Sequence, residues 1–247
     1  MKEIFSAQHP LIKYWTNLRS DAHFRKTEGT VLLEGKNCIQ DICKSTRAKC
    51  LIVTDPTIIP KGILADDIYI VTDALMNKIS GVKSPEGIIA ELYMPKNAPF
   101  SNVKKILVAD RIQDPGNLGT LIRSSLAFGW DGIFILPGTS DPFNDKALRA
   151  AKGATFLLPI YSGGWKELQD MLKTNNLKLV VADTTGKAPS SFLHTAMALV
   201  LGNEAQGAQI PSELPYEQVT LNMQGAMESL NVAVAGSILL YLYQEGT

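Results

Sequence analysis

Residues 104–136 constrain the fold more than any other segment of this 247-residue chain. An apolar run from Ile106 to Ala109 predicts a buried strand, and Asp114-Pro115-Gly116-Asn117 is strong turn chemistry, with Asn117 placed as a helix N-cap. Apolar residues then recur at helical spacing as far as Gly129, and Gly132 to Leu136 is a second apolar run. Strand, loop, helix and strand in this order predict a parallel βαβ crossover. We therefore expect an α/β protein built around a parallel sheet.

The glycine-rich turn of this segment does not match the loops that bind nucleotide phosphates. The Gly-x-Gly-x-x-Gly spacing of dinucleotide sites is absent, and so is the Gly-x-x-x-x-Gly-Lys-Ser/Thr loop. The chain therefore lacks the glycine pattern that a nicotinamide-dependent oxidoreductase would need to bind its cofactor.

Two later segments place small polar residues directly after short apolar strands. The run Met197 to Leu201 ends at Gly202-Asn203-Glu204, and a strand at about 218–221 leads to a final, largely apolar helix at roughly 228–244 with Ser229 and Asn231 at its start. Open α/β sheets bind ligands beyond the carboxyl ends of their strands, so these residues are site candidates. Taken singly, the glycines also fit simple turns and Ser229 fits a helix cap.

Taken together, three motifs in order resemble the SpoU (TrmH-type) RNA ribose methyltransferases of the SPOUT class. The first motif is Asp-Pro-Gly-Asn-Leu-Gly at 114–119, with Ile-Arg at 122–123 and Ala-Phe-Gly at 127–129. The second is Leu-Gly-Asn-Glu at 201–204, and the third runs through Leu221-Asn222-Met223 to Ser229-Leu230-Asn231. The resemblance covers roughly residues 104–243. It implies methyl transfer from S-adenosylmethionine to a ribose 2′-hydroxyl, with no metal.

The resemblance also implies roles for individual polar residues. Arg123 is the main catalytic candidate, because a cation there would stabilise negative charge at the reacting oxygen or a phosphate; the alternative is an ordinary exposed helix arginine. Asn117 would shape its loop, and Glu204 would hold the site through hydrogen bonds. Ser229 and Asn231 would contact the target nucleotide or the reacting oxygen.

A cofactor pocket is implied at the same loops. Gly202 would let the backbone approach the cofactor closely. Apolar side chains would line the adenosine pocket, although they are equally good core residues. The expected wall positions are Leu221, Met223 and Leu230, with Ile210 and Thr184 beside them. Asn222 departs from the family, which often has Pro before the Met, and this puts the shape of that loop in question.

The chain divides into two domains on the same evidence. Residues 1–95 alternate short strands and helices as a small α/β unit, 96–103 is a Pro- and Asn-rich linker, and 104–247 holds the motifs. The first unit is loosely similar to the substrate-binding domain of many SpoU enzymes, best at Leu-Glu-Gly 33–35 and at 84–90. For the second domain the resemblance implies a deep trefoil knot and pairing as a homodimer, which no periodicity in the sequence would reveal.

Charge is unevenly distributed. The whole chain has 24 basic and 24 acidic residues, but residues 1–50 hold nine Lys or Arg against five Asp or Glu. Any electrostatic grip on RNA is therefore expected at the N-terminal end. The candidate RNA-binding residues are Lys13, Arg19, Arg25 and Lys26, with Lys2 beside them. A basic helix that is only solvated surface is the alternative.

The remaining features exclude several classes. Cys38, Cys43 and Cys50 do not have zinc spacing, and the three His residues are scattered, so no metal site is expected. The chain has no apolar run of 18 residues, so a membrane span is not expected, and no signal peptide is recognisable. Free thiols fit a reducing compartment, and we expect a cytoplasmic protein.

An N-terminal RNA-binding domain is more typical of ribosomal RNA enzymes in the family, so large-subunit ribosomal RNA is favoured as the substrate. A tRNA ribose methyltransferase and a catalytically inactive RNA-binding homologue stay open as alternatives. The intact set of polar candidates argues against the inactive homologue.

Overall fold

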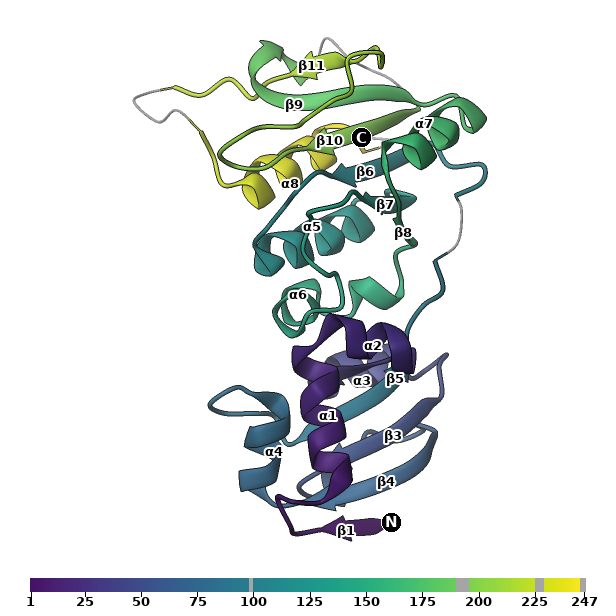
Figure 1. Ribbon diagram of the computed structural model, residues 1–247, viewed down its shortest axis with the longest axis vertical. Coiled ribbons are helices and arrows are strands. Elements are labelled where there is room, and N and C mark those ends of the chain that lie inside the picture. The colour runs from purple at the N-terminus through teal and green to yellow at the C-terminus, as the bar shows by residue number, and fades with distance from the viewer. Residues whose placement is uncertain (98–99, 190–195, 225–228, 245–247) are drawn as a thin grey trace. The chain divides into compact units, whose positions relative to one another are not determined.

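The computed structural model describes residues 1–97, 100–189, 196–224 and 229–244, which form two compact units (Figure 1). The first unit consists of residues 1–95 together with 143–156, and the second of 96–142 with 157–247. Sequence analysis placed 143–156 in the second domain, whereas their packing assigns them to the first. The reason is apolar contact, because Phe143 and Leu148 are buried with Val31.

The first unit contains a five-stranded sheet in the order β1-β4-β3-β5-β2. Strands β1, β4 and β3 are parallel, and β5 is antiparallel to both β3 and β2. Its elements are β1 (Lys2–Ile4), α1 (Pro10–Ser20), α2 (Ala22–Glu28), β2 (Thr30–Glu34), α3 (Lys36–Ile42), β3 (Ala48–Val53), a short 3-10 turn η1 (Pro56–Ile58), β4 (Ala65–Val71), α4 (Asp73–Ser80), β5 (Ile88–Tyr93), α6 (Asp145–Ala151) and a second 3-10 turn η2 (Ala154–Phe156).

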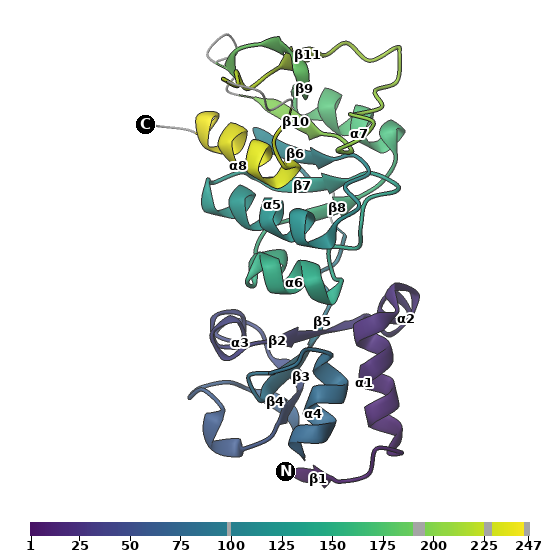
Figure 2. The same cartoon turned by 90° about the vertical axis from the view of Figure 1, so that its left-hand side faces the viewer.

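Alternating side chains of the central strands give this sheet two apolar faces. Cys50 and Ile52 of β3 lie with Trp15 of α1 and residues of α4, whereas Leu51 and Val53 lie with residues of α3. Figure 2 shows α1 and α4 on one side of the sheet and α3 on the other. Because both faces are covered, the central strands β3 and β5 are buried almost throughout.

The second unit contains a six-stranded sheet, all parallel, in the order β11-β9-β10-β6-β7-β8. Its elements are β6 (Lys105–Ala109), α5 (Pro115–Ala127), β7 (Gly132–Ile135), β8 (Ile160–Ser162), α7 (Trp165–Thr174), β9 (Lys178–Lys187), β10 (Met197–Leu201), β11 (Glu217–Val219) and α8 (Val232–Leu242). The predicted fold class is confirmed: a parallel-sheet α/β domain follows a smaller N-terminal α/β domain.

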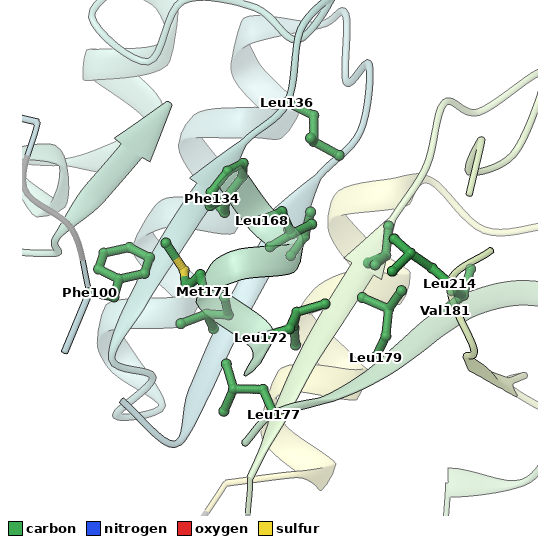
Figure 3. Packing of buried hydrophobic residues seen from close by; sticks show 14 residues of the cluster. Phe100, Phe134, Leu136, Leu168, Met171, Leu172, Leu177, Leu179, Val181 and Leu214 are labelled. Carbon is green, nitrogen blue, oxygen red and sulfur yellow. The ribbon is translucent and has the colours of Figure 1, made fainter. Parts of the chain in front are cut away.

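Helices cover both faces of this sheet. Leu168, Met171 and Leu172 of α7 share a core cluster with Val108 and Phe134. Figure 3 shows the three α7 side chains and Phe134 in close view. Helices α5 and α8 lie together on the opposite face, joined by a hydrogen bond of 2.7 Å between the Ser124 and Ser237 hydroxyls. Gly236 makes this close approach possible, because a Cβ there would lie 2.4 Å from Leu201 and 2.5 Å from Leu121.

Several element boundaries differ from those predicted. Helix α5 begins one turn earlier than expected, because Asp114 is its N-cap and Asn117 is the third helical residue, whose N–H binds the Asp114 carboxylate at 2.8 Å. Strands β1 and β8 and helix α2 were not predicted at these positions. Helix α8 starts at Val232 with Asn231 as its N-cap, and residue 228 of the predicted helix lies outside the described residues. Residues 98–99 of the predicted linker do so as well.

Candidate active site

An open cleft of about 530 Å³ lies at the carboxyl ends of β9, β10 and β11, where an open parallel sheet binds ligands. The loops that follow β10 and β11 and the residues that precede α8 line it. Eight of the predicted site residues are brought together there: Thr184, Gly202, Glu204, Leu221, Met223, Ser229, Leu230 and Asn231. This volume is within the range of pockets that hold drug-sized ligands.

One wall of the cleft is a bulge in β9. Pairing with β11 jumps from Val181, opposite Gln218, to Lys187, opposite Val219, so that Asp183 and Thr184 leave the ladder and line the cleft. The predicted turn at 183–186 is therefore an excursion within one long strand. The Thr220 hydroxyl donates to the Thr184 carbonyl at 3.1 Å and ties this wall to the loop after β11.

Gly202 has a structural role that the sequence analysis did not assign. A Cβ there would lie 2.1 Å from the Ala208 backbone nitrogen and 2.3 Å from the Gly207 carbonyl carbon. The loop folds back on itself at this point, with Gly207 donating to the Asn203 carbonyl at 2.9 Å. A side chain at 202 would therefore displace the loop itself, before any ligand is considered.

A chain of hydrogen bonds joins the three motifs at the mouth of this cleft. The Asn231 amide donates to Asn117 Oδ1 at 3.1 Å, and Asn117 Nδ2 donates to Glu204 Oε1 at 2.6 Å. Asn231 is fixed in turn, because its Oδ1 accepts from the Ala233 and Val234 N–H groups as the N-cap of α8. Each amide uses its oxygen and its NH₂ group in one defined direction. The Glu204 carboxylate is thereby held by residues from two helices.

Arg123 and Ile210 are the two predicted site residues that the structure does not bring into this arrangement. Arg123 is exposed on α5, six residues and about 9 Å along the helix axis beyond Asn117, and it does not line the cleft of its own chain. Ile210 packs half-buried against the core cluster that α7 covers. Ile210 is not among the described residues that line this cleft, because its side chain packs into the core instead.

Sequence analysis missed the pair Asp110 and Arg111, which follows directly after β6. The Asp110 carboxylate is buried and accepts from Arg111 Nε at 3.2 Å, from Arg111 Nη2 at 3.3 Å and from the Gln209 N–H at 2.7 Å. Arg111 Nη1 donates to Gln206 Oε1 at 2.8 Å, and its Nη2 donates to the Gly207 carbonyl at 2.8 Å. We call this ion pair the Asp110–Arg111 clamp. It holds the loop at 203–209 through its contacts with Gln206, Gly207 and Gln209.

The backbone is adapted to the clamp. Arg111 has a φ of 57°, a left-handed conformation that is uncommon outside glycine, and its carbonyl accepts from Asn203 Nδ2 at 3.2 Å. Gly138 leaves room for the arginine stem, since a Cβ there would lie 2.9 Å from Arg111 Cγ. Opposite charges adjacent in sequence at the carboxyl end of a buried strand were the signal that could have identified this pair.

The predicted RNA-binding residues of the first unit differ in availability. Lys13 and Lys26 are exposed, whereas Arg19 is half-buried and donates to the Lys78 carbonyl at 3.3 Å. Arg25 is 2% exposed, and its Nη1 donates to the Leu18 and Arg19 carbonyls at 2.7 and 2.8 Å. Arg25 is therefore withdrawn as an RNA contact, because its guanidinium caps the C-terminal end of α1 from inside the unit.

Within the described ranges, His, Cys, Asp and Glu side chains form no group of three that could hold a metal ion. No helix among the same residues has the length and apolar character needed to cross a membrane.

Comparisons with known proteins agree with this geometry. Residues 104–241 match the model of the SpoU rRNA Methylase family, and residues 9–90 match the MRM3-like substrate binding domain. The 23S rRNA (guanosine(2553)-2′-O)-methyltransferase RlmP of Bacillus subtilis is 34% identical over 98% of both chains. A solved RNA 2′-O ribose methyltransferase is 28% identical with a TM-score of 0.81, over 98% of this chain and 97% of that one. The AdoMet-bound rRNA methyltransferase of Sinorhizobium meliloti has a TM-score of 0.85 at 23% identity over 98% and 97%, which is a likeness of fold.

Proposed function

This chain belongs to the SpoU rRNA methylase family, and on that premise we propose that it transfers a methyl group from S-adenosylmethionine to a ribose 2′-hydroxyl of large-subunit ribosomal RNA. The observation that carries the proposal is the hydrogen-bonded chain Asn231–Asn117–Glu204, which joins the three motifs at the cleft. RlmP of Bacillus subtilis, which matches 98% of this chain, is a 23S rRNA methyltransferase, and this favours ribosomal RNA over tRNA.

The residues present fit the cofactor by their chemistry. Leu221, Met223 and Leu230 offer an apolar wall for an adenine ring, and the backbone of the loops at 202–207 and 220–221 offers polar groups for a ribose and an amino acid. The cofactor supplies a methyl group already activated on a sulfonium. The protein must position the ribose oxygen in line with it, which is a large part of such a catalytic effect.

Proton removal falls to polar groups at the mouth of the cleft. Glu204 is exposed there, and Asn117 holds one of its oxygens, so the carboxylate has a fixed direction toward an incoming hydroxyl. Ser229 lines the same cleft and can orient the hydroxyl by hydrogen bonding. We assign Glu204 and Ser229 to the reacting oxygen, and Asn117 and Asn231 to holding Glu204.

We further propose that the chain pairs as a homodimer through α8. The exposed apolar side chains of its outer face recur at helical spacing: Val234, Ile238, Tyr241 and Leu242 are each about 40–50% exposed. A contiguous apolar stripe of this kind marks an interaction surface in a soluble protein.

The family resemblance also implies a trefoil knot in residues 104–247. A cytoplasmic location fits the three free thiols at Cys38, Cys43 and Cys50.

A homodimer would give Arg123 its role. Arg123 lies on the exposed side of α5, next to Ser124, which binds Ser237 of α8. A residue beside the pairing helix can enter the cleft of the partner chain instead of its own. We therefore propose that Arg123 stabilises charge in the partner's active site.

Two measurements test these proposals. Tritium transfer to 23S rRNA, followed by mapping of alkali-resistant positions, should show one ribose-methylated nucleotide; RNA and S-adenosylhomocysteine binding without transfer would indicate the inactive homologue instead. Mixing inactive Arg123→Ala protein with inactive Asn117→Ala protein should restore about a quarter of wild-type activity, because half the dimers are mixed and each has one intact site. No restoration would place Arg123 in the site of its own chain.

A further inference from the structure

The first unit contains a second open cleft, of about 270 Å³, which the proposed methyl transfer does not use. It lies between α1 and the beginnings of β3 and β4, with Glu28 of α2 at its side. The half-buried rings of Tyr14 and Tyr69 line it above the fully buried Trp15, together with the ammonium group of Lys49. Aromatic rings can stack on a flat ligand, and a cation beside them can donate hydrogen bonds to its polar edge.

The floor of this cleft is a buried carboxylate. Glu91 of β5 is 2% exposed and lies on the face of the sheet that α1 covers. It accepts hydrogen bonds from five side chains: Lys49 Nζ at 2.8 Å, Tyr14 Oη at 2.9 Å, Thr30 Oγ1 at 2.9 Å, Trp15 Nε1 at 3.1 Å and Cys50 Sγ at 3.4 Å. Burial opposes ionisation, but the bonds from Lys49, Thr30 and Tyr14 outweigh it and hold the pKa of Glu91 below its usual value.

This network fixes Lys49, which would otherwise be a mobile surface side chain. The Lys49 ammonium donates to Glu91 at 2.8 Å and to Tyr14 Oη at 3.0 Å, and it lies 5.2 Å from the centre of the Tyr14 ring. The side chain is 37% exposed toward the cleft. An ammonium has three donors, so one remains for a ligand. Burial lowers the pKa of Lys49, but the bonds to Glu91 and Tyr14 raise it further, so the group stays charged.

The charge of the lining argues against a phosphate. Three carboxylates, those of Glu28, Asp67 and Glu91, face one ammonium, that of Lys49, so the lining has a formal charge of −2. The charge is still −1 when Lys2, which pairs with Asp67 at the rim, is counted. An anion would be repelled, whereas a neutral group with hydrogen-bond donors on one edge and an acceptor on another would satisfy Asp67 and Lys49 together. Nucleobases have this pattern, and unstacked bases in RNA are bound by stacking on aromatic side chains.

We propose that this cleft binds one unstacked nucleobase of the RNA substrate, with Lys49 donating to a base acceptor and Asp67 accepting from a base donor. The proposal rests on the proposed function, because it takes RNA as the substrate. Lys2 is at the rim, where it pairs with Asp67 at 2.8 Å and lies 5.4 Å from the centre of the Tyr69 ring. It can bind the phosphate of the same nucleotide, since the exposed pair with Asp67 is weak in water.

Asp67→Asn in the full chain is the decisive variant, because the sign of its effect separates a base from a phosphate. The Asp67 side chain is 41% exposed, so its amide analogue should leave the fold intact. If the cleft binds a base donor, affinity for 23S rRNA in filter binding should fall about tenfold, as for loss of a charged hydrogen bond. Tighter binding would mean that the carboxylate repels a phosphate, and unchanged binding would mean that it contacts nothing; either overturns the proposal.

Salt dependence gives a second measurement. Lys49→Met should lower the affinity about tenfold while leaving the slope of log K against log salt unchanged, whereas Lys2→Met should reduce that slope by about 0.7–0.9. Lys61→Met is the matched control, with the same change in charge at an exposed position outside this cleft, and it should bind like the wild type in low and high salt. A Lys49 variant that matches the control, or that changes the slope, contradicts base binding.

A thermodynamic cycle identifies the nucleotide. The bound 23S fragment is synthesised with single abasic positions, and wild-type and Asp67→Asn proteins are compared on each. One position should weaken wild-type binding and have no further effect on the variant. S-adenosylhomocysteine calorimetry on every variant serves as the control for the second unit. Wild-type protein that neither binds nor methylates 23S rRNA would refute the proposed function, whereas an active wild type without a coupled position would refute this cleft alone.

Discussion

The two clefts of this protein are built in different ways. The cleft of the second unit is made by loops whose shape depends on backbone contacts, such as the close approach of Gly202 to Ala208 and the bulge in β9. The cleft of the first unit is made by side chains that converge on one buried carboxylate, Glu91, from α1, β2 and β3. The backbone-built cleft left short motifs in the sequence, whereas the side-chain-built cleft left none, because its partners are 41–77 residues away from Glu91 in the chain.

Gly202→Val should have the largest effect, because it breaks the backbone-built cleft at its tightest point. The added side chain meets backbone atoms at 2.1 Å, so the loop must move, and S-adenosylhomocysteine binding should be lost in calorimetry. The melting temperature should also fall, since overpacking costs about 1–3 kcal/mol. Gly207→Ala is the control: its φ of 67° adds strain, but a Cβ there has open space. Binding retained in the valine variant would show that the loop adapts.

Glu91→Gln should break the other cleft. Losing charged hydrogen bonds at a buried site should destabilise the first unit by about 2–3 kcal/mol. Urea unfolding followed by Trp15 fluorescence, in a background of Trp130→Phe and Trp165→Phe, reads this unit separately. S-adenosylhomocysteine binding should not change, because every residue that lines its proposed cleft belongs to the second unit.

The same pair of proteins gives a pH test. The pKa of Glu91 in the folded protein lies below its unfolded value of about 4.5, so its contribution to stability is complete above that pH. It is lost as the pH falls through the folded pKa. The stability difference between wild type and Glu91→Gln should therefore be constant from pH 7 to about 5 and shrink below about 4.5. A difference that stays constant in acid would mean that the carboxylate charge is not what the network uses.

In the cleft of the second unit, Asn117→Ala should lower the rate of methyl transfer without changing the shape of the cofactor pocket. It removes the middle of the chain that holds Glu204, and the turnover number should fall about 100-fold, as for loss of one preorganised catalytic hydrogen bond. Affinity for S-adenosylhomocysteine should change little, because Asn117 does not line the cleft. Thr120→Ala on the same helix is the control, since its hydroxyl binds only the Gly116 carbonyl among the described contacts. Equal losses in both variants would point to damage to α5.

Arg111→Met should have the smallest of these effects. The loop at 203–209 keeps its backbone bonds but loses the Asp110–Arg111 clamp, so the Kd for S-adenosylhomocysteine should rise about tenfold, the value of one charged hydrogen bond. The turnover number at saturating cofactor should be near that of the wild type, and Arg111→Lys should restore part of the affinity. A fall in turnover at saturation would assign Arg111 to the chemistry rather than to positioning.

Predictions from the sequence succeeded for features that depend on residues close together in the chain. The parallel βαβ unit at 104–136 and the α/β fold class followed from apolar runs, turn chemistry and family motifs. Eight of the residues predicted for the site line one cleft, and their roles there stay predictions. Errors arose where a long-range contact decided the outcome. Arg25 looked like a basic surface residue, yet its guanidinium lies inside the unit on the Leu18 and Arg19 carbonyls. Asn117 looked like an N-cap, but Asp114 three residues earlier accepts the helical N–H.

The sequence by itself determined the class of fold and the family, and it indicated the loops at which we propose that the chemistry takes place. These features depend on periods of two and 3.6 residues and on glycine or asparagine at turns, which are local properties of the chain. Only the tertiary structure decided that Asn117, Glu204 and Asn231 form one chain, that Asp110 and Arg111 clamp the loop, and that Glu91 fixes Lys49. Burial and hydrogen-bond partners depend on side chains brought together from distant elements, and the chemistry of a carboxylate or a guanidinium is set by those partners.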